Sequence, residues 1–223
     1  MNNFIYHNPT KLVFGKGQIA RLPKLIPAGK RIMLTFGGGS VKRNGVYDQV
    51  VAELEGRDLV EFWGIEANPS VETLREAYDA GQRIFGESRV QELVAKEAAL
   101  PKDIAWHFIG HLQTNKVKQI VPFISLIHSI DSPHLLEEVE RCAARCDRRV
   151  DCLLQLHIAE EETKFGFSPD ECRDYLAAGT WRDLAHVRLR GVMGMATLTD
   201  DEQAVRREFA TLQAFFAEIK EQY

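Results

Sequence analysis

The sequence lacks a long apolar run, and it lacks a segment that would direct secretion. No stretch of the 223 residues approaches the roughly 20 consecutive apolar residues that a membrane-spanning helix needs. The start of the chain, MNNFIYHNPT, has neither the basic region nor the apolar region of a signal peptide. These absences predict a cytoplasmic protein that does not bind a membrane.

An excess of positive charge is also absent. The chain has 28 Lys and Arg against 32 Asp and Glu, which gives a formal net charge of −4. No basic block is present, and Lys116 and Lys118 are typical of a solvated helix face rather than of a track for phosphates. Nucleic acid is therefore not an expected partner.

Cysteine is scarce, and the spacings typical of metal ligands are missing. Cys142, Cys146, Cys152 and Cys172 form no CxxC pair. Their apolar surroundings predict small buried or half-buried side chains. The first two share helical spacing, but no second pair of ligands matches them. Because His107 and His111 would lie on a strand and its exit turn, they do not share a helix face, and we expect no metal site.

Apolar runs of strand length alternate along the chain with segments of helical periodicity. A chain of this length that is 45% hydrophobic can bury a core in one or two domains. Seven strands are predicted, at residues 31–36, 59–65, 83–85, 106–109, 126–130, 152–158 and 187–195. Residues 4–6 and 12–14 flank a Pro-containing turn and predict an N-terminal hairpin. Alternating strands and helices predict an α/β fold with a parallel sheet.

Capping residues mark where several helices begin. Ser168 and Glu171 have the capping-box spacing, in which each side chain bonds the backbone of the other residue. Thr199 and Glu202 repeat this spacing before a final amphipathic helix. Both pairs therefore predict helix starts.

The segment from residue 83 to residue 116 contains two strand-and-turn units joined by a helix. Because parallel strands carry their chemistry at their carboxyl ends, the residues after these strands are expected to form a ligand-facing rim. The candidates are Gly86, Glu87, Ser88, Gly110, Gln113, Asn115 and Lys116. For Asn115 and Lys116 a helix start with a solvated lysine is an equal alternative.

Several motifs occur in order between about residue 75 and the last residue: REAYDAGQRIFGESRVQELV, WHFIGHLQTNK, IHSID, EEETKFGF and LRGVMGMAT. They closely resemble the pyridoxal-phosphate homeostasis proteins, whose (β/α)8 barrel is related to the N-terminal barrel of alanine racemase. The resemblance implies a protein that binds pyridoxal 5'-phosphate and keeps it available, without catalytic turnover. The residues that it places at the cofactor are Ser88, His107, Gln113, Asn115, Ser129 and Met193.

Residues 1–72 resemble a different family. The segments MNNFIYHNPTKLVFGKG, LTFGGGSVKRNGVYDQV and GIEANPSVETL are similar to the start of iron-dependent alcohol dehydrogenases of the NADPH-using aldehyde-reductase type. This resemblance implies that Gly38, Gly39 and Ser40 lie near the adenosine phosphate of the nucleotide, with Asn68 in a second turn on the cofactor side. We expect a dehydrogenase-like βαβ segment at 1–74 and a barrel fragment at 75–223, joined as one continuous α/β domain.

Neither family's chemistry is complete in this chain. The pyridoxal-phosphate family implies a Schiff-base lysine at the end of the first barrel strand, but the matching stretch FWGIEANP, residues 62–69, has no lysine. Ser88 also replaces an asparagine of the family motif. The family's last two strands, which hold the phosphate, are expected to be missing, as are the dehydrogenase's second glycine motif and its iron-binding domain. Weak, non-covalent cofactor binding is therefore expected.

The glycine turn at residues 37–40 allows two interpretations. Consecutive backbone N–H groups before a helix attract phosphate, but a tight turn that needs positive φ explains the glycines equally well. The strand at 31–36 could occupy the vacant place of the last barrel strand, which would bring this turn to the phosphate-binding rim. The predicted fold is thus an incomplete or rebuilt (β/α)8 barrel of the TIM type, with a doubly wound open sheet as the alternative.

Three functions stay open at this point. The first is pyridoxal-phosphate binding, the second is an NADPH-binding dehydrogenase relic, and the third is a non-catalytic chimeric scaffold. Lys164 is a conceivable substitute amine, although its flanking glutamates favour a protonated surface lysine. Glu160, Glu161 and Glu162 are typical of a solvated acidic turn. A monomer or a weak homodimer is expected.

Overall fold

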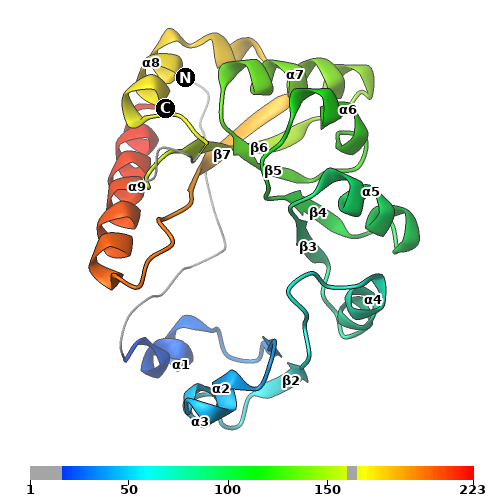
Figure 1. The fold of residues 1–223 in the computed structure, drawn as a ribbon, viewed down its shortest axis with the longest axis vertical. Coiled ribbons are helices and arrows are strands. Elements are labelled where there is room, and N and C mark those ends of the chain that lie inside the picture. The colour runs from blue at the N-terminus through cyan, green and yellow to red at the C-terminus, as the bar shows by residue number, and fades with distance from the viewer. Residues whose placement is uncertain (1–16, 160–164) are drawn as a thin grey trace. The chain divides into compact units, whose positions relative to one another are not determined.

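The computed structural model describes residues 17–159 and 165–223 (Figure 1). The chain divides into two compact units, with the boundary between Gln82 and Arg83. Each unit is described by itself. The predicted hairpin at 4–6 and 12–14, the acidic turn at 160–162 and Lys164 lie outside the described residues.

The smaller unit contains two parallel strands and short helices. Its elements are η1 (Gln18–Arg21), α1 (Leu22–Leu25), β1 (Arg31–Thr35), α2 (Ser40–Arg43), α3 (Val46–Glu53), β2 (Asp58–Phe62) and α4 (Val71–Asp79). β1 pairs with β2 from Arg31 opposite Asp58 to Thr35 opposite Phe62. This βαβ arrangement is the one that the sequence predicts for this part of the chain.

The larger unit is built on a parallel sheet whose strand order is β3-β4-β5-β6-β7. Its strands are β3 (Ile84–Glu87), β4 (Ala105–Phe108), β5 (Leu126–Ile130), β6 (Val150–Leu156) and β7 (Val187–Gly194). The helical elements are α5 (Val90–Ala99), η2 (Thr114–Lys116), α6 (Val117–Ile120), α7 (Pro133–Arg145), α8 (Pro169–Ala178), η3 (Thr180–Asp183) and α9 (Glu202–Gln222). The α/β class with parallel strands is therefore confirmed.

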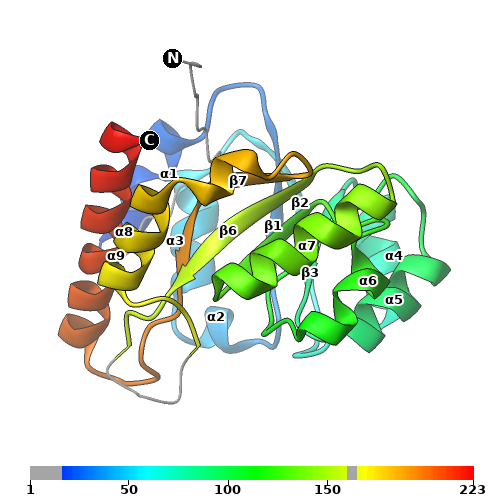
Figure 2. The same cartoon turned by 90° about the horizontal axis from the view of Figure 1, so that it is seen from above.

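The core of the larger unit lies between the sheet and the helices that follow its strands, as Figure 2 shows for α7 beside β6. Burial alternates along β4, where Trp106 and Phe108 are buried while Ala105 and His107 are half-buried. Because successive side chains of a strand point to opposite faces, one face of β4 joins the core and the other carries His107. Leu136 and Val139 of α7 are fully buried in the same core.

Capping differs between the two helix starts that the sequence predicts. The box at Ser168 is confirmed: its N–H donates to Glu171 Oε2 at 2.8 Å, and the Glu171 N–H donates to Ser168 Oγ at 3.2 Å. The prediction of a capping box at Thr199 is wrong. Asp201 caps α9 by accepting from the Gln203 N–H at 2.8 Å, while Thr199 Oγ1 accepts from the Asp201 N–H in the turn before it.

The cysteines are mostly buried, as predicted. Cys142, Cys152 and Cys172 are buried, whereas Cys146 is exposed, so the prediction is wrong for this residue. Cys146 follows the last residue of α7, and a helix end at the surface leaves its side chain in solvent. Among the described helices, none is long and apolar enough to cross a membrane.

Gly110 holds the exits of β3 and β4 together, and we expect Gly110→Ala to destabilise the protein by about 3 kcal/mol. A Cβ at this position would lie 2.0 Å from the Ser88 carbonyl oxygen and 2.9 Å from the Ser88 Cα, so the backbone itself must move. Urea unfolding measures the effect. Gly86→Ala is the matched control, because its Cβ would meet only the Ile109 side chain, at 3.6 Å and 3.7 Å. Equal stability of the two variants would contradict the close packing of the Gly110 backbone against the Ser88 backbone.

Candidate functional site

The candidate site lies at the carboxyl ends of β3 to β7. Since these strands are parallel, their exit residues come to one edge of the sheet, where α/β proteins place their ligands. The exits contribute Ser88 after β3, His111 after β4, Asp131 after β5, His157 after β6 and Met195 after β7. Sequence reasoning predicted the first two of these exits as a rim.

The exit of β3 is fixed by a buried carboxylate. Glu87 Oε1 accepts from the backbone N–H groups of Ser88 at 2.7 Å and Arg89 at 3.4 Å. Its second oxygen, Oε2, lies 2.5 Å from Lys96 Nζ in α5. Glu87, predicted from the sequence as a rim residue, is thus turned into the helix layer, and Ser88 stands at the rim.

Two histidines form a pair on the sheet face opposite to the one that Trp106 and Phe108 of β4 present to the core. His107 Nδ1 and His128 Nε2 lie 3.1 Å apart, so one nitrogen donates and the other accepts. Burial lowers the pKa of His107, although nearby Asp151 acts in the opposite direction. Burial, with a smaller contribution from His107, lowers the pKa of His128 to about 4. Both imidazoles are therefore neutral near pH 7.

The strand register brings charged residues to the same face as the histidine pair. His107 pairs with Leu126, Leu126 with Asp151, and Asp151 with Arg188, so these side chains stand side by side. The Asp151 carboxylate accepts from Arg188 Nε at 2.7 Å and Nη2 at 2.9 Å, and Arg190 Nε lies 3.4 Å from it. We call the sheet face that carries His107, His128, Asp151 and Arg188 the histidine face.

At the exit of β4, an aromatic stack covers His111. The rings of His111 and Phe165 are 3.8 Å apart and nearly parallel, and His111 Nδ1 lies 3.1 Å from Asp131 Oδ2. Gln155 Nε2 donates to the Phe165 carbonyl at 2.8 Å, which fixes the segment that carries this ring. Phe165 is 52% exposed, so the outer side of this stack is open to a flat ligand.

Ser129 of β5 is buried, with 1% of its surface exposed, and its hydroxyl has no hydrogen-bond partner within the described part of the chain. A buried hydroxyl without a partner is costly and uncommon in proteins. Met193 of β7 is half-buried and stands opposite Gln155 in the register. A polar group of a ligand placed here would accept a hydrogen bond from the Ser129 hydroxyl.

Gln113 and Asn115 lie in and beside the turn η2, beyond the exit of β4. Both are exposed, and η2 has no side-chain cap. The Lys116 N–H donates to the Gln113 carbonyl at 2.9 Å, which closes this turn. Their side chains are thus accessible at the rim, and their predicted contact with a cofactor stays a prediction.

The glycine turn Gly38, Gly39 and Ser40 belongs to the smaller unit. Gly39 precedes α2 with φ −73°, and Gly37 and Gly38 are not among the positive-φ glycines. The explanation that these glycines are needed for positive φ is therefore wrong. Just before the turn, the ring of Phe36 stacks on the ring of Trp63, with the ring centroids 3.9 Å apart.

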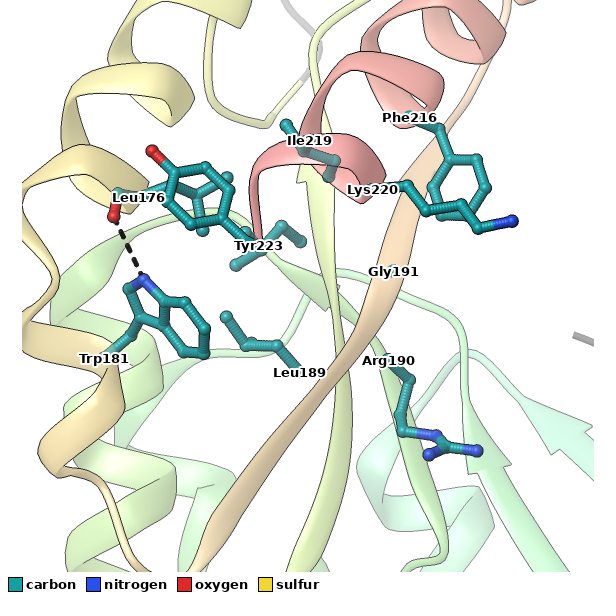
Figure 3. A pocket seen from close by; sticks show the side chains of 10 residues that line it. Leu176, Trp181, Leu189, Arg190, Gly191, Phe216, Ile219, Lys220 and Tyr223 are labelled. Atoms are coloured by element: carbon teal, nitrogen blue, oxygen red, sulfur yellow. Dashed lines mark hydrogen bonds between the residues drawn. The ribbon is translucent and has the colours of Figure 1, made fainter. Parts of the chain in front are cut away.

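A separate, mostly apolar cavity of about 70 Å3 lies between β7, η3 and the end of α9. Figure 3 shows Trp181, Leu189 and Tyr223 around this space, with the Trp181 Nε1–H donating to the Leu176 carbonyl at 3.2 Å. Arg190 and Gly191 of β7 line this cavity, but none of the predicted site residues does.

Sequence reasoning missed His128, Asp151 and Arg188. Alternation along β5 could have found the first one, because His128 stands two residues after Leu126, the partner of His107, and therefore points to the same face as His107. Asp151 and Arg188 carried no such signal, since the register between β5, β6 and β7 brings them there. Among the described residues, no three His, Cys, Asp or Glu side chains gather as a metal site.

A parallel sheet with exit residues gathered at one edge defines an α/β protein with a candidate ligand-binding edge. Residues 68–223 match the model of the alanine racemase N-terminal domain, and residues 9–86 match that of iron-containing alcohol dehydrogenase. This chain belongs to the alanine racemase N-terminal domain family. The similarity of its first part to the dehydrogenase family is confirmed as well, and the two matches overlap around the predicted join.

Individual relatives agree with both matches. The chain is 32% identical over 169 residues to the pyridoxal phosphate homeostasis protein of Aquifex aeolicus, covering 75% of this chain and 73% of the relative. It is 50% identical over 95 residues to the NADPH-dependent aldehyde reductase YqhD of Escherichia coli, covering 43% of this chain but only 24% of the reductase.

Solved structures agree with the match to the alanine racemase N-terminal domain. PipY of Synechococcus elongatus PCC7942 without PLP is 38% identical with a TM-score of 0.65, covering 70% of this chain and 72% of PipY. PipY with PLP bound is 30% identical with a TM-score of 0.61, covering 92% of this chain and 83% of PipY. An alanine racemase of Clostridium difficile 630, at 12% identity and a TM-score of 0.55, shares the fold alone.

The neutral histidine pair predicts a specific loss of stability in acid. Because the pKa of His128 falls from 6.5 to about 4 on folding, the unfolded state binds a proton that the folded state excludes. This contribution to stability is complete above pH 6.5 and is lost as the pH falls toward 4. The ring is partly exposed, so we expect about 1 kcal/mol of loss at about pH 5 after allowance for solvent screening.

His128→Gln removes this titration and keeps a hydrogen-bonding group beside His107. Urea unfolding at about pH 7.5 and about pH 5 should therefore show a smaller difference for the variant than for the unaltered chain. His134→Gln, at an exposed position of α7, is the matched control. If the two variants lose the same free energy of unfolding in acid, His128 is not the group responsible.

Proposed function

We propose that this chain binds pyridoxal 5'-phosphate at the carboxyl edge of β3 to β7, as a homeostasis-type protein without catalytic turnover. The observation that carries the proposal is the match to PipY with PLP bound, over 92% of this chain at 30% identity. The residues proposed at the cofactor are Ser88, His107, Gln113, Asn115, Ser129 and Met193. We expect them to hold a small molecule by polar and van der Waals contacts.

The described residues fit the ring of this cofactor better than they fit its covalent attachment. The buried Ser129 hydroxyl lacks a partner, and the neutral pair of His107 and His128 offers a ring nitrogen at a half-buried face. Bound pyridoxal phosphate supplies an aldehyde that reacts with amines and a ring that withdraws electrons. The amine is the missing part, because residues 62–69 contain no lysine.

Lys96 does not replace that amine. Its side chain is 9% exposed, and its Nζ is engaged by Glu87 Oε2 at 2.5 Å and lies 3.7 Å from Glu92 Oε2. A protonated amine held by carboxylates is a poor nucleophile, because the free base is the reactive form. Non-covalent and weak binding follows as the proposed mode.

An absorbance titration with pyridoxal 5'-phosphate, followed by borohydride reduction and peptide mapping, tests this mode. We expect saturable binding that dialysis reverses, and no lysine that is labelled in preference to the others. Pyridoxal without the phosphate is the control for general amine reactivity. Selective labelling of one lysine would contradict non-covalent binding and would identify the amine. Absence of any saturable change would contradict the proposed function.

Ser129→Ala separates a binding role from a structural role. Because the hydroxyl is buried and has no described partner, its removal should leave the free energy of unfolding unchanged or raise it by up to about 1 kcal/mol. Loss of a hydrogen bond to the cofactor should weaken binding by about fivefold. Ser125→Ala, at a half-buried position just before β5, is the matched control. Unchanged affinity in Ser129→Ala would remove this residue from the site.

NADPH binding by the smaller unit is a second candidate function. It is favoured by the 50% identity to YqhD over 95 residues and by the turn at Gly38, Gly39 and Ser40. Phe36 stands just before this turn and stacks on Trp63, which follows the end of β2, so a bound nucleotide would quench Trp63 fluorescence. Quenching by NADPH without a response to pyridoxal phosphate would favour this candidate.

A further inference from the structure

We propose that the ion pair of Glu87 and Lys96 is a positioning device that sets the ligand-facing exit of β3. The inference rests on the proposed function for its effect on affinity, but the geometry that it describes belongs to the ligand-free chain. Both residues are charged and yet nearly inaccessible, with 8% of Glu87 and 7% of Lys96 exposed. Charges at this depth are uncommon unless they are paired, and they are often retained for orientation.

The Glu87 carboxylate takes the place of a helix cap. Arg89 is the N-cap residue of α5, and its side chain caps no backbone group. Glu87 Oε1 instead accepts from the N–H groups of Ser88 at 2.7 Å and Arg89 at 3.4 Å. A negative charge at a helix start is also favoured by the helix dipole. One carboxylate oxygen therefore sets the path of the chain between β3 and α5.

Lys96 orients this carboxylate from the other side. Its Nζ lies 2.5 Å from Glu87 Oε2, which leaves Oε1 directed at the backbone of the turn. Lys96 stands in the second half of α5, so the helix end, the carboxylate and the strand exit are tied together. Ser88 cannot move without breaking this set of bonds.

The backbone positions of Glu87 and Ser88 constrain the exit of β4. The Ile109 N–H donates to the Glu87 carbonyl at 3.0 Å. The Ser88 carbonyl oxygen lies so close to Gly110 that a Cβ there would be 2.0 Å away. Residues 88 and 109–110, which begin the proposed rim, thus depend on the placement of one buried side chain.

A purely stabilising role would be served as well by apolar residues. Replacing a buried ion pair with well-packed apolar side chains of similar size is often neutral or stabilising, whereas removing one partner leaves a buried charge. The paired change Glu87→Met with Lys96→Met therefore removes the direction of the carboxylate while it preserves the packing volume. If the pair positions the exit, this variant folds normally but holds Ser88 loosely.

The experiment compares this double variant with the unaltered full chain in three measurements. In the ligand-free state we expect amide hydrogen exchange at Ser88 and Arg89 to rise by about tenfold, with no change at Leu154 of β6. We expect the affinity for pyridoxal 5'-phosphate to fall by about five- to tenfold, and the absorbance maximum of the bound cofactor to shift. Urea unfolding checks that the variant is folded.

Two further variants serve as controls. Lys96→Arg keeps the cation, so this variant should retain slow amide exchange at Ser88 and Arg89 and most of the affinity for pyridoxal 5'-phosphate. The double change Arg173→Met with Glu218→Met removes a bidentate ion pair between α8 and α9, with bonds of 2.7 Å and 2.8 Å, and should leave exchange at Ser88 and the affinity unchanged.

The outcomes separate this inference from the proposed function. If the unaltered chain does not respond to pyridoxal phosphate, the proposed function fails, and amide exchange alone decides whether the pair positions the exit. If the Glu87 and Lys96 double variant is folded and exchanges and binds like the unaltered chain, the positioning role is overturned. The same holds if the Arg173 and Glu218 control shows equal effects.

Discussion

The larger unit depends on the parallel hydrogen-bonded register of β3 to β7. Parallel neighbours must be joined by crossovers, so each strand starts at the same end of the sheet and each exits at the other. This constraint gathers residues from distant parts of the sequence, such as Ser88, His111 and Asp131, at one edge. The fold therefore supplies a rim before any particular side chain supplies chemistry.

Charge is handled differently on the two faces of this sheet. On the helix side, Glu87 and Lys96 are buried as a pair and bonded to the backbone. On the histidine face, His107 and His128 are neutral, while Asp151 is matched by Arg188. Because these groups satisfy one another within the described residues, the orphaned Ser129 hydroxyl is the exception, which makes it informative about a ligand.

The chain joins parts that resemble two α/β families, and their common architecture explains why such a join is compatible with regular secondary structure. The two family matches overlap at residues 68–86, a stretch that contains α4. A helix followed by a strand is present in both architectures, so the backbone continues without a break in pattern. The lysine that the resemblance implies for residues 62–69 is absent from the sequence.

The sequence by itself determined the approximate positions of the strands, the start of α8 and the start of the rim, because the hydrophobic period and the Ser168 cap are local signals. It misplaced the cap of α9, because Thr199 accepts from the Asp201 N–H in the preceding turn and Asp201 accepts from the Gln203 N–H. Only the tertiary structure decided that Glu87 turns toward Lys96 and that His107 meets His128. Those contacts depend on strand register and helix packing, which join residues that the sequence keeps apart.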